Sequence, residues 1–364
     1  MAAKYIAYVG SDTNVHGNKG LSIYEVDNEK GNLKKISEVD ANNASYLKIS
    51  ADGRFLYVVV DEGVSAFKIL DDGNLEFINT GSIRGMRGCY LDVDKENKYM
   101  FVAGMYDGKA TVLRINEDGS VGEITDNFFN KGLGSVAETN KSPHITCVKP
   151  TPDGNYVCVI DAGMDQIKIM DFDRQLGRMH MRDMIHCEQE SGPRKMLFDK
   201  TGRFMYVLFG KSSIVKAYSY DCSGASPVFR QIDYESTARI IEDSKNNTAL
   251  AMRINHNGAY LLCSNGGDNT VGVFERNEET GKLNRLCVLP ISGSYPIDIG
   301  MLPDSNFIFS VNNEEETITL FGLHPHTTII DKRGNEVEKS YFSMSCNPIK
   351  VTKPNCMRIV KLER

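Results

Sequence analysis

Short runs of apolar residues alternate with polar ones along most of the chain, and glycine-containing turns separate these runs. The clearest unit opens with residues 145–148, turns at Pro152-Asp153-Gly154 and continues into the apolar run 156–160. A third run, 166–170, alternates again. Alternation with a period of two is typical of strands, and the sequence has no long stretch with the 3.6-residue period of helices. The pattern therefore predicts an all-β fold.

This unit recurs at intervals of about 50 residues, a period typical of propellers and solenoids. Its copies begin near Ser45, Tyr90, Ile145, Lys195, Ala251 and Ile297. A seventh copy comes from the two ends, because residues 5–38 hold three strand patterns and the run 356–360 offers the missing inner strand. Residues 1–364 are therefore predicted to form one domain, a seven-bladed β-propeller of four-stranded antiparallel blades, closed by the C-terminal strand joining the N-terminal blade.

Composition and charge narrow the range of partners. The formal net charge is −6, and the sequence has no dense run of lysine and arginine, so a nucleic-acid partner is not expected. No apolar stretch of about 18 residues predicts a membrane span, and the N-terminal residues do not resemble a signal peptide. The nine cysteines are scattered without a CxxC pair, which indicates free thiols. We therefore expect a cytoplasmic protein that acts on a small molecule; the oligomeric state stays open.

Ligands of propellers bind at one mouth of the central channel, where inner strands start and second strands end. His144, at the start of an inner strand, is a candidate general acid or base, because imidazole titrates near neutral pH. Arg194, at the start of the next inner strand, is a candidate clamp for a carboxylate or phosphate. Each side chain could instead be structural, His144 in the channel wall and Arg194 in an ion pair between blades.

Five further residues are predicted to bind substrate at the same mouth. They are Arg87, Lys195, Lys211, Asp161 and Asn265. The three cations would add positive charge for a developing oxyanion. Asp161 could also cap its own loop by accepting bonds from nearby N–H groups, as aspartates often do.

The sequence does not support a phosphate-binding loop or a metal site. Gly210-Lys211-Ser212 is similar to the end of a phosphate-binding loop, but Met205 stands where that motif needs its first glycine. His324 and His326 are close in sequence, yet no histidine pair has metal-ligand spacing on a helix. Neither a metal nor another cofactor is therefore expected.

Several motifs together resemble the seven-bladed lactonase family, which includes bacterial 6-phosphogluconolactonase of the propeller type and fungal carboxymuconate lactonizing enzyme. They are Tyr8-Val9-Gly10, Ser142-Pro143-His144, Pro152-Asp153-Gly154, Gly192-Pro193-Arg194, Ser264-Asn265 and Pro354-Asn355-Cys356. The resemblance covers essentially the whole chain and implies the same propeller. It also implies that His144 and Arg194 match the family's histidine and its first arginine.

The rest of the family's site departs from the pattern in this chain. The family's Gly-Pro-Arg-His motif ends here in Lys195, its Asn-Glu pair falls on Phe209-Gly210, and its Ser-Asn-Arg motif ends in Gly266. Because a scaffold can persist while its site changes, three functions stay open. The first is a lactonase acting on a small polar, anionic, sugar-derived lactone. The others are an isomerase or lyase on a sugar or unsaturated-acid derivative, and a ligand-binding propeller without turnover.

Overall fold

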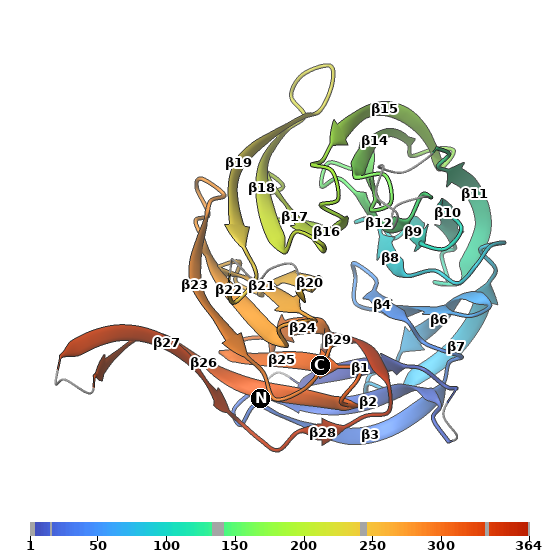
Figure 1. The fold of residues 1–364 in the computed structure, drawn as a ribbon. Coiled ribbons are helices and arrows are strands. Elements are labelled where there is room, and N and C mark those ends of the chain that lie inside the picture. Colours follow the sequence, from blue (N-terminus) through green and yellow to red (C-terminus); the bar gives the residue numbers. More distant parts are fainter. Residues whose placement is uncertain (1–3, 15–16, 133–141, 241–245, 332–334, 363–364) are drawn as a thin grey trace.

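The computed structural model describes residues 4–14, 17–132, 142–240, 246–331 and 335–362, and every regular element in them is a β-strand. Seven separate sheets are arranged in a ring, and the strands of each sheet follow one another outward from the central channel (Figure 1). All strand pairs are antiparallel. The predicted all-β, seven-bladed propeller is thus confirmed.

The blades follow chain order, and each is given from its inner to its outer strand. The first blade has β29 (Pro354–Leu362), β1 (Lys4–Ser11), β2 (Gly20–Asp27) and β3 (Asn32–Asp40). The next two have β4 (Tyr46–Ile49), β5 (Phe55–Val60), β6 (Gly63–Ile69) and β7 (Leu75–Gly81), then β8 (Tyr90–Val93), β9 (Tyr99–Gly104), β10 (Lys109–Ile115) and β11 (Val121–Phe129). The fourth and fifth have β12 (Ile145–Pro150), β13 (Tyr156–Asp161), β14 (Gln166–Asp173) and β15 (Arg178–His186), then β16 (Pro193–Phe198), β17 (Phe204–Phe209), β18 (Ile214–Asp221) and β19 (Val228–Ser236). The last two have β20 (Ala249–Ile254), β21 (Tyr260–Asn265), β22 (Thr270–Arg276) and β23 (Leu283–Pro290), then β24 (Pro296–Met301), β25 (Phe307–Asn312), β26 (Thr317–Ile330) and β27 (Glu336–Met344), with β28 (Ile349–Lys350) beside β26.

The ring is closed by β29, as the sequence predicts. This C-terminal strand pairs with β1 from Lys4↔Leu362 to Ser11↔Pro354. Met357 of β29 is fully buried and packs in a cluster that joins the first and last blades. Closure therefore gives the backbone groups of β1 a partner on the side that an open sheet would leave exposed.

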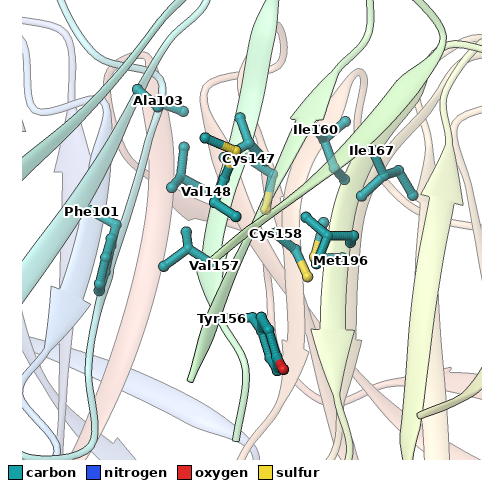
Figure 2. Packing of buried hydrophobic residues seen from close by; sticks show 14 of the residues in the cluster. Phe101, Ala103, Cys147, Val148, Tyr156, Val157, Cys158, Ile160, Ile167 and Met196 are labelled. Carbon is teal, nitrogen blue, oxygen red and sulfur yellow. The ribbon is translucent and has the colours of Figure 1, made fainter. Parts of the chain in front are cut away.

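The hydrophobic core lies between blades, because a single four-stranded sheet cannot bury its own two faces. Six clusters of buried side chains together cover all seven junctions of the ring. The second strands β5, β9, β13 and β17 are buried at every position, whereas the outermost strands are largely exposed. Figure 2 shows one junction, where Phe101 of β9 approaches Val148 and Val157 of the neighbouring blade, within the cluster that they share.

A tyrosine latch recurs at several junctions. The hydroxyl of Tyr8 donates to the Gly73 carbonyl at 3.0 Å, that of Tyr57 to Gly119 at 3.1 Å, and that of Tyr206 to Gly281 at 2.8 Å. Each tyrosine lies in the second strand of one blade, and each glycine lies in the outer turn of the next. The turn glycines have positive φ, such as +92° at Gly73, which a side chain rarely tolerates. The latch thus ties each of these sheets to its neighbour by a directed bond as well as by packing.

Candidate functional site

The starts of the inner strands lie beside the ends of the second strands at one mouth of the channel. The register shows it directly, with Ile145 opposite Asp161, Pro193 opposite Phe209 and Ala249 opposite Asn265. Residues that precede or open an inner strand therefore share this mouth with residues that end a second strand. The sequence analysis predicted the site residues at this mouth.

His144 immediately precedes β12, and its backbone is firmly held. Its N–H donates to Asp161 Oδ1 at 2.9 Å, and its carbonyl accepts from Ala162 at 2.9 Å. The imidazole is half-buried, and its only hydrogen-bond contact among the described residues is from Nε2 to Ser142 Oγ at 3.3 Å. A fixed backbone with a lightly engaged ring leaves the imidazole available for proton transfer.

Asp161 serves the loop and is not placed to bind substrate. Its side chain is fully buried, and Oδ1 also accepts the backbone N–H groups of Gly163 at 3.0 Å and Met164 at 3.1 Å. The Asn130 amide donates to Oδ2. The predicted substrate contact is therefore replaced by the capping role, which the sequence had left as an alternative. By holding the His144 N–H, Asp161 fixes the position of the candidate base.

Asn265 is likewise part of the framework, contrary to the prediction that it binds substrate. It is fully buried, and its Nδ2 donates to the Thr237 carbonyl at 2.6 Å and to Thr270 Oγ1 at 3.0 Å. Its Oδ1 accepts from Thr237 Oγ1 and Asn247 Nδ2, both at 2.9 Å. With all four hydrogen bonds made to protein, the amide has no capacity left for a ligand.

Arg194 lies in β16, next to the strand that His144 precedes. Its Nε donates to the Leu250 carbonyl at 3.1 Å, and no acceptor among the described residues bonds its two Nη groups. A Cβ at position 210 would lie 3.5 Å from Arg194 Cδ. A side chain at position 210, where the family carries a glutamate, would thus begin in van der Waals contact with the arginine. The free half of the guanidinium can receive an anionic group from the channel.

Tyr295 lies beside Gly266, the other position where this chain has a glycine in place of a charged residue of the family. A Cβ at position 266 would lie 3.1 Å from Tyr295 Cδ2 and 2.7 Å from Leu250 Cδ1. Tyr295 has a φ of +56°, and its N–H donates to Asn269 Oδ1 at 2.9 Å. A larger residue at Gly266 would therefore displace the tyrosine ring from this part of the mouth.

Lys195 points into the channel below Arg194. Its Nζ lies 5.4 Å from the centre of the Tyr46 ring, a cation–π distance. Burial lowers the pKa of Lys195; Asp298 opposes this effect and the nearby Arg194 adds to it.

A group of charges that the sequence analysis missed lies next to Lys195 and Tyr46. Asp298 of β24 is buried and accepts from Arg253 Nη2 of β20 at 3.0 Å and from Arg358 Nη1 of β29 at 2.7 Å. The Arg358 guanidinium also lies 4.7 Å from the centre of the Tyr46 ring. The sequence contained one signal for this group, because each of these three inner-strand patterns includes a charged residue. Two arginines that share one carboxylate leave an excess of positive charge here.

The remaining predicted residues lie farther from this group. Arg87 pairs with Asp61 at 3.2 Å and lies 3.9 Å from Asp12, so its guanidinium is partly neutralised. Lys211 is exposed and packs against Gly192, whose Cβ would lie 3.0 Å from Lys211 Cγ. Both can add to the positive field at the rim, and neither joins the group around Arg194 and Lys195.

The described residues form neither a metal-binding cluster nor a membrane-spanning helix. Within the described ranges, no group of three or more histidine, cysteine, aspartate or glutamate side chains is arranged to hold a metal ion. No helix long and apolar enough to cross a membrane occurs in the described part of the chain. All nine cysteines are free thiols.

Known proteins are similar to this chain in sequence and in architecture. The profile of the family described as "Lactonase, 7-bladed beta-propeller" matches residues 6–343. A 6-phosphogluconolactonase of Bacillus subtilis is 28% identical over 328 residues, which cover 87% of this chain and 91% of the relative. A 6-phosphogluconolactonase of Formosa agariphila is 26% identical, over 91% of this chain and 96% of its own. The solved structure of the periplasmic gluconolactonase of Pseudomonas aeruginosa superposes with a TM-score of 0.85 at 21% identity, over 99% of this chain and 100% of that one, and shows the same fold.

Proposed function

The chain belongs to the seven-bladed β-propeller lactonase family, and from this membership we propose that it hydrolyses a small, anionic, sugar-derived lactone at the mouth of its central channel. The proposal is carried by His144, which immediately precedes the inner strand β12, and by Arg194 of the neighbouring inner strand β16. The imidazole is lightly engaged, and the guanidinium has free Nη groups. The two relatives described above at 28% and 26% identity are 6-phosphogluconolactonases.

In the proposed reaction His144 acts first as a general base. Its imidazole takes a proton from a water molecule, and the hydroxyl oxygen attacks the lactone carbonyl carbon. The carbonyl becomes a tetrahedral oxyanion, which Arg194 stabilises through its free Nη groups. The ring C–O bond then breaks, and the leaving alkoxide takes the proton from the His144 imidazolium. The product is a hydroxy acid, which releases one proton to solvent at neutral pH.

The oxyanion is assigned to Arg194 because guanidinium keeps its charge at any working pH. Lys195 is a weaker choice, since burial lowers its pKa. Lys195 and the two arginines around Asp298 instead supply the positive field that attracts an anionic substituent of the substrate. We therefore expect a lactone with a phosphate or carboxylate group to react faster than its neutral counterpart.

The test is continuous acid release from 6-phosphogluconolactone and from gluconolactone, corrected for the uncatalysed reaction in buffer. We expect His144→Ala to lower kcat by about 100-fold or more, the contribution typical of a general base. His180→Ala is the matched control, because His180 is an exposed histidine of the outer strand β15.

Two results would contradict the proposal. One is a wild-type rate no higher than that of His144→Ala with either lactone. The other is a product whose mass equals that of the substrate, because hydrolysis adds one water and isomerisation adds none. Equal rates with the two lactones would reject only the preference for an anionic substrate.

We also propose that the protein works in a reducing compartment such as the cytoplasm. Its nine free cysteines support this, since disulfides form in oxidising compartments. Fractionation of the native host followed by immunodetection tests the proposal, and recovery of the protein outside the cytoplasm would reject it.

A further inference from the structure

A second cavity lies at the far end of the channel, away from His144. Its volume is about 410 Å³, within the range of small-molecule sites. The walls come from the last residues of β4, β8 and β12 and from the turns that follow them, including Ser50, Glu96 and Pro152. His144 precedes β12, whereas these residues end or follow inner strands. The cavity and the candidate active site thus open at opposite ends of the inner strands.

Two lysines share one buried carboxylate in the wall of this cavity. Asp92 of β8 is 2% exposed and accepts from Lys48 Nζ of β4 at 2.6 Å and from Lys149 Nζ of β12 at 2.5 Å. Burial alone would raise the pKa of Asp92, but Lys149 and Lys48 outweigh it and hold that pKa far below its ordinary value. Two ammonium groups thus share one carboxylate, and the cluster has one positive charge in excess.

Neither ammonium group exhausts its hydrogen bonds on Asp92. An ammonium carries three N–H donors. Within the part of the chain that the structure describes, Asp92 is the only polar partner of Lys48 Nζ and of Lys149 Nζ. Both lysines line the cavity and are partly exposed. Their remaining donors are thus available to an acceptor that enters the cavity.

The other charges of the cavity are already committed. Glu96 pairs with Lys98 at 2.9 Å and with Arg174 at 3.7 Å. Asp94 accepts the backbone N–H groups of Lys98 at 2.7 Å and Tyr99 at 2.9 Å, which closes its own turn. Over all the residues that line the cavity, four cations (Lys48, Lys95, Lys149 and Arg174) face three carboxylates (Asp92, Asp94 and Glu96), so one positive charge remains in excess.

Two aromatic rings provide an apolar wall beside the lysines. Phe172 is 8% exposed and packs edge-on against Tyr99 and Phe101, with ring centres 5.3 and 5.2 Å apart. Phe198 packs edge-on against Tyr220 at 5.5 Å. Both rings line the cavity, and their neighbours hold them in place. An apolar or planar body can lie against them.

We propose that this cavity binds a small organic anion, whose carboxylate or phosphate group contacts Lys48 and Lys149 and whose body lies against Phe172 and Phe198. This second site is separate from the mouth that holds His144 and Arg194, and it does not depend on lactone hydrolysis. The excess positive charge arises because two lysines share one carboxylate. Removing a lysine and removing the carboxylate therefore change the charge of the site in opposite directions. Loss of a lysine leaves a neutral pair, whereas loss of the carboxylate leaves two unpaired ammonium groups.

The test is calorimetric titration of the full chain with phenyl phosphate and with benzoate, which separate the two kinds of anionic group. We expect Lys149→Met to weaken binding of the preferred probe about tenfold or more and Asp92→Asn to strengthen it. Phe198→Ala should weaken binding of phenyl phosphate and leave that of inorganic phosphate unchanged. Arg194→Met, at the other mouth, is the matched control and should leave the affinity at this site as in the wild type.

The proposal is overturned if neither probe binds, if Lys149→Met binds as the wild type does, or if Arg194→Met abolishes all binding. A second readout covers variants of low stability, since a ligand that binds only the folded state raises its melting temperature. Phenyl phosphate should raise the melting temperature of Asp92→Asn more than that of the wild type. An equal or smaller rise would also reject the site.

Discussion

Asp161 and Asn265 show how a polar residue at a predicted binding position can belong to the scaffold. Both end a second strand at the mouth, and both are fully buried with every bond made to protein. Sequence position alone placed them correctly at the mouth, but it carried no information on whether their side chains face the channel or their own loops. The positions of Arg194 and Lys195 were predicted in the same way; Lys195 reaches the Tyr46 ring of a distant blade, and Arg194 bonds the Leu250 carbonyl of the next blade.

We predict that Asp161→Ala lowers the free energy of unfolding by about 3 kcal/mol, because a buried carboxylate that accepts several hydrogen bonds is lost. Urea unfolding measures the change. The control is Asp171→Ala, which removes an exposed pair with Arg182 and should cost no more than about 1 kcal/mol. Unfolding like that of the wild type, together with lost activity, would instead assign Asp161 to the substrate.

At the scale of elements, the strand order follows the repeat, and one hairpin departs from it. Strand β26 has 14 residues, and with β27 it extends well beyond the ring (Figure 1). His326 in this arm bonds Glu338 of β27 through Nδ1 at 2.8 Å and Glu275 of β22 through Nε2 at 2.6 Å. The sequence analysis found no role for His326, because its two partners come from other strands.

These contacts predict a pH dependence of the arm. Hydrogen bonds to Glu275 and Glu338 raise the pKa of His326 from 6.5 to about 9. Because the folded-state pKa is the higher one, the contribution of His326 to stability is fully present below pH 6.5. It is lost as the pH rises towards 9. An NMR titration of the imidazole measures the pKa directly.

The matched variants are His326→Gln and His324→Gln. The difference in unfolding midpoint between the wild type and His326→Gln should shrink between pH 6.5 and 9. His324→Gln is the control for the loss of an imidazole from this arm, because His324 stacks on Tyr341 at 4.6 Å. A His326 resonance that titrates near pH 6.5 would contradict the proposed bridge.

At the scale of the whole molecule, the channel collects positive charge although the chain has a net charge of −6. Asp92 and Asp298, two carboxylates of the inner strands, are each shared by two cations from other blades. The Asp92 group needs three consecutive blades, whereas the Asp298 group also needs the closing strand β29. Arg358, for example, reaches Asp298 because β29 takes its place beside β1. Closure therefore builds the site as well as the fold.

We predict that deletion of residues 354–364 prevents folding, because β1 loses its inner partner and the last junction loses Met357. The measurement is the soluble yield and the circular dichroism of the shortened chain. A synthetic peptide of residues 352–362 added during refolding should restore soluble protein. The same peptide with Met357→Asp should fail, since it places a charge in a fully buried position. A soluble, folded shortened chain would show that the ring does not depend on this strand.

The sequence by itself determined the all-β class, the number of blades and the identity of the closing strand. These features depend on local alternation and on a repeat, both of which are visible along the chain. Only the tertiary structure decided which polar residues face the channel and that Asp298 holds Arg253 and Arg358. The physical reason is that each of these contacts joins residues from different blades, whose side-chain directions are set by packing around the ring. The seven-bladed propeller on which the sequence analysis settled is therefore also the source of the charge pattern that sequence could not reveal.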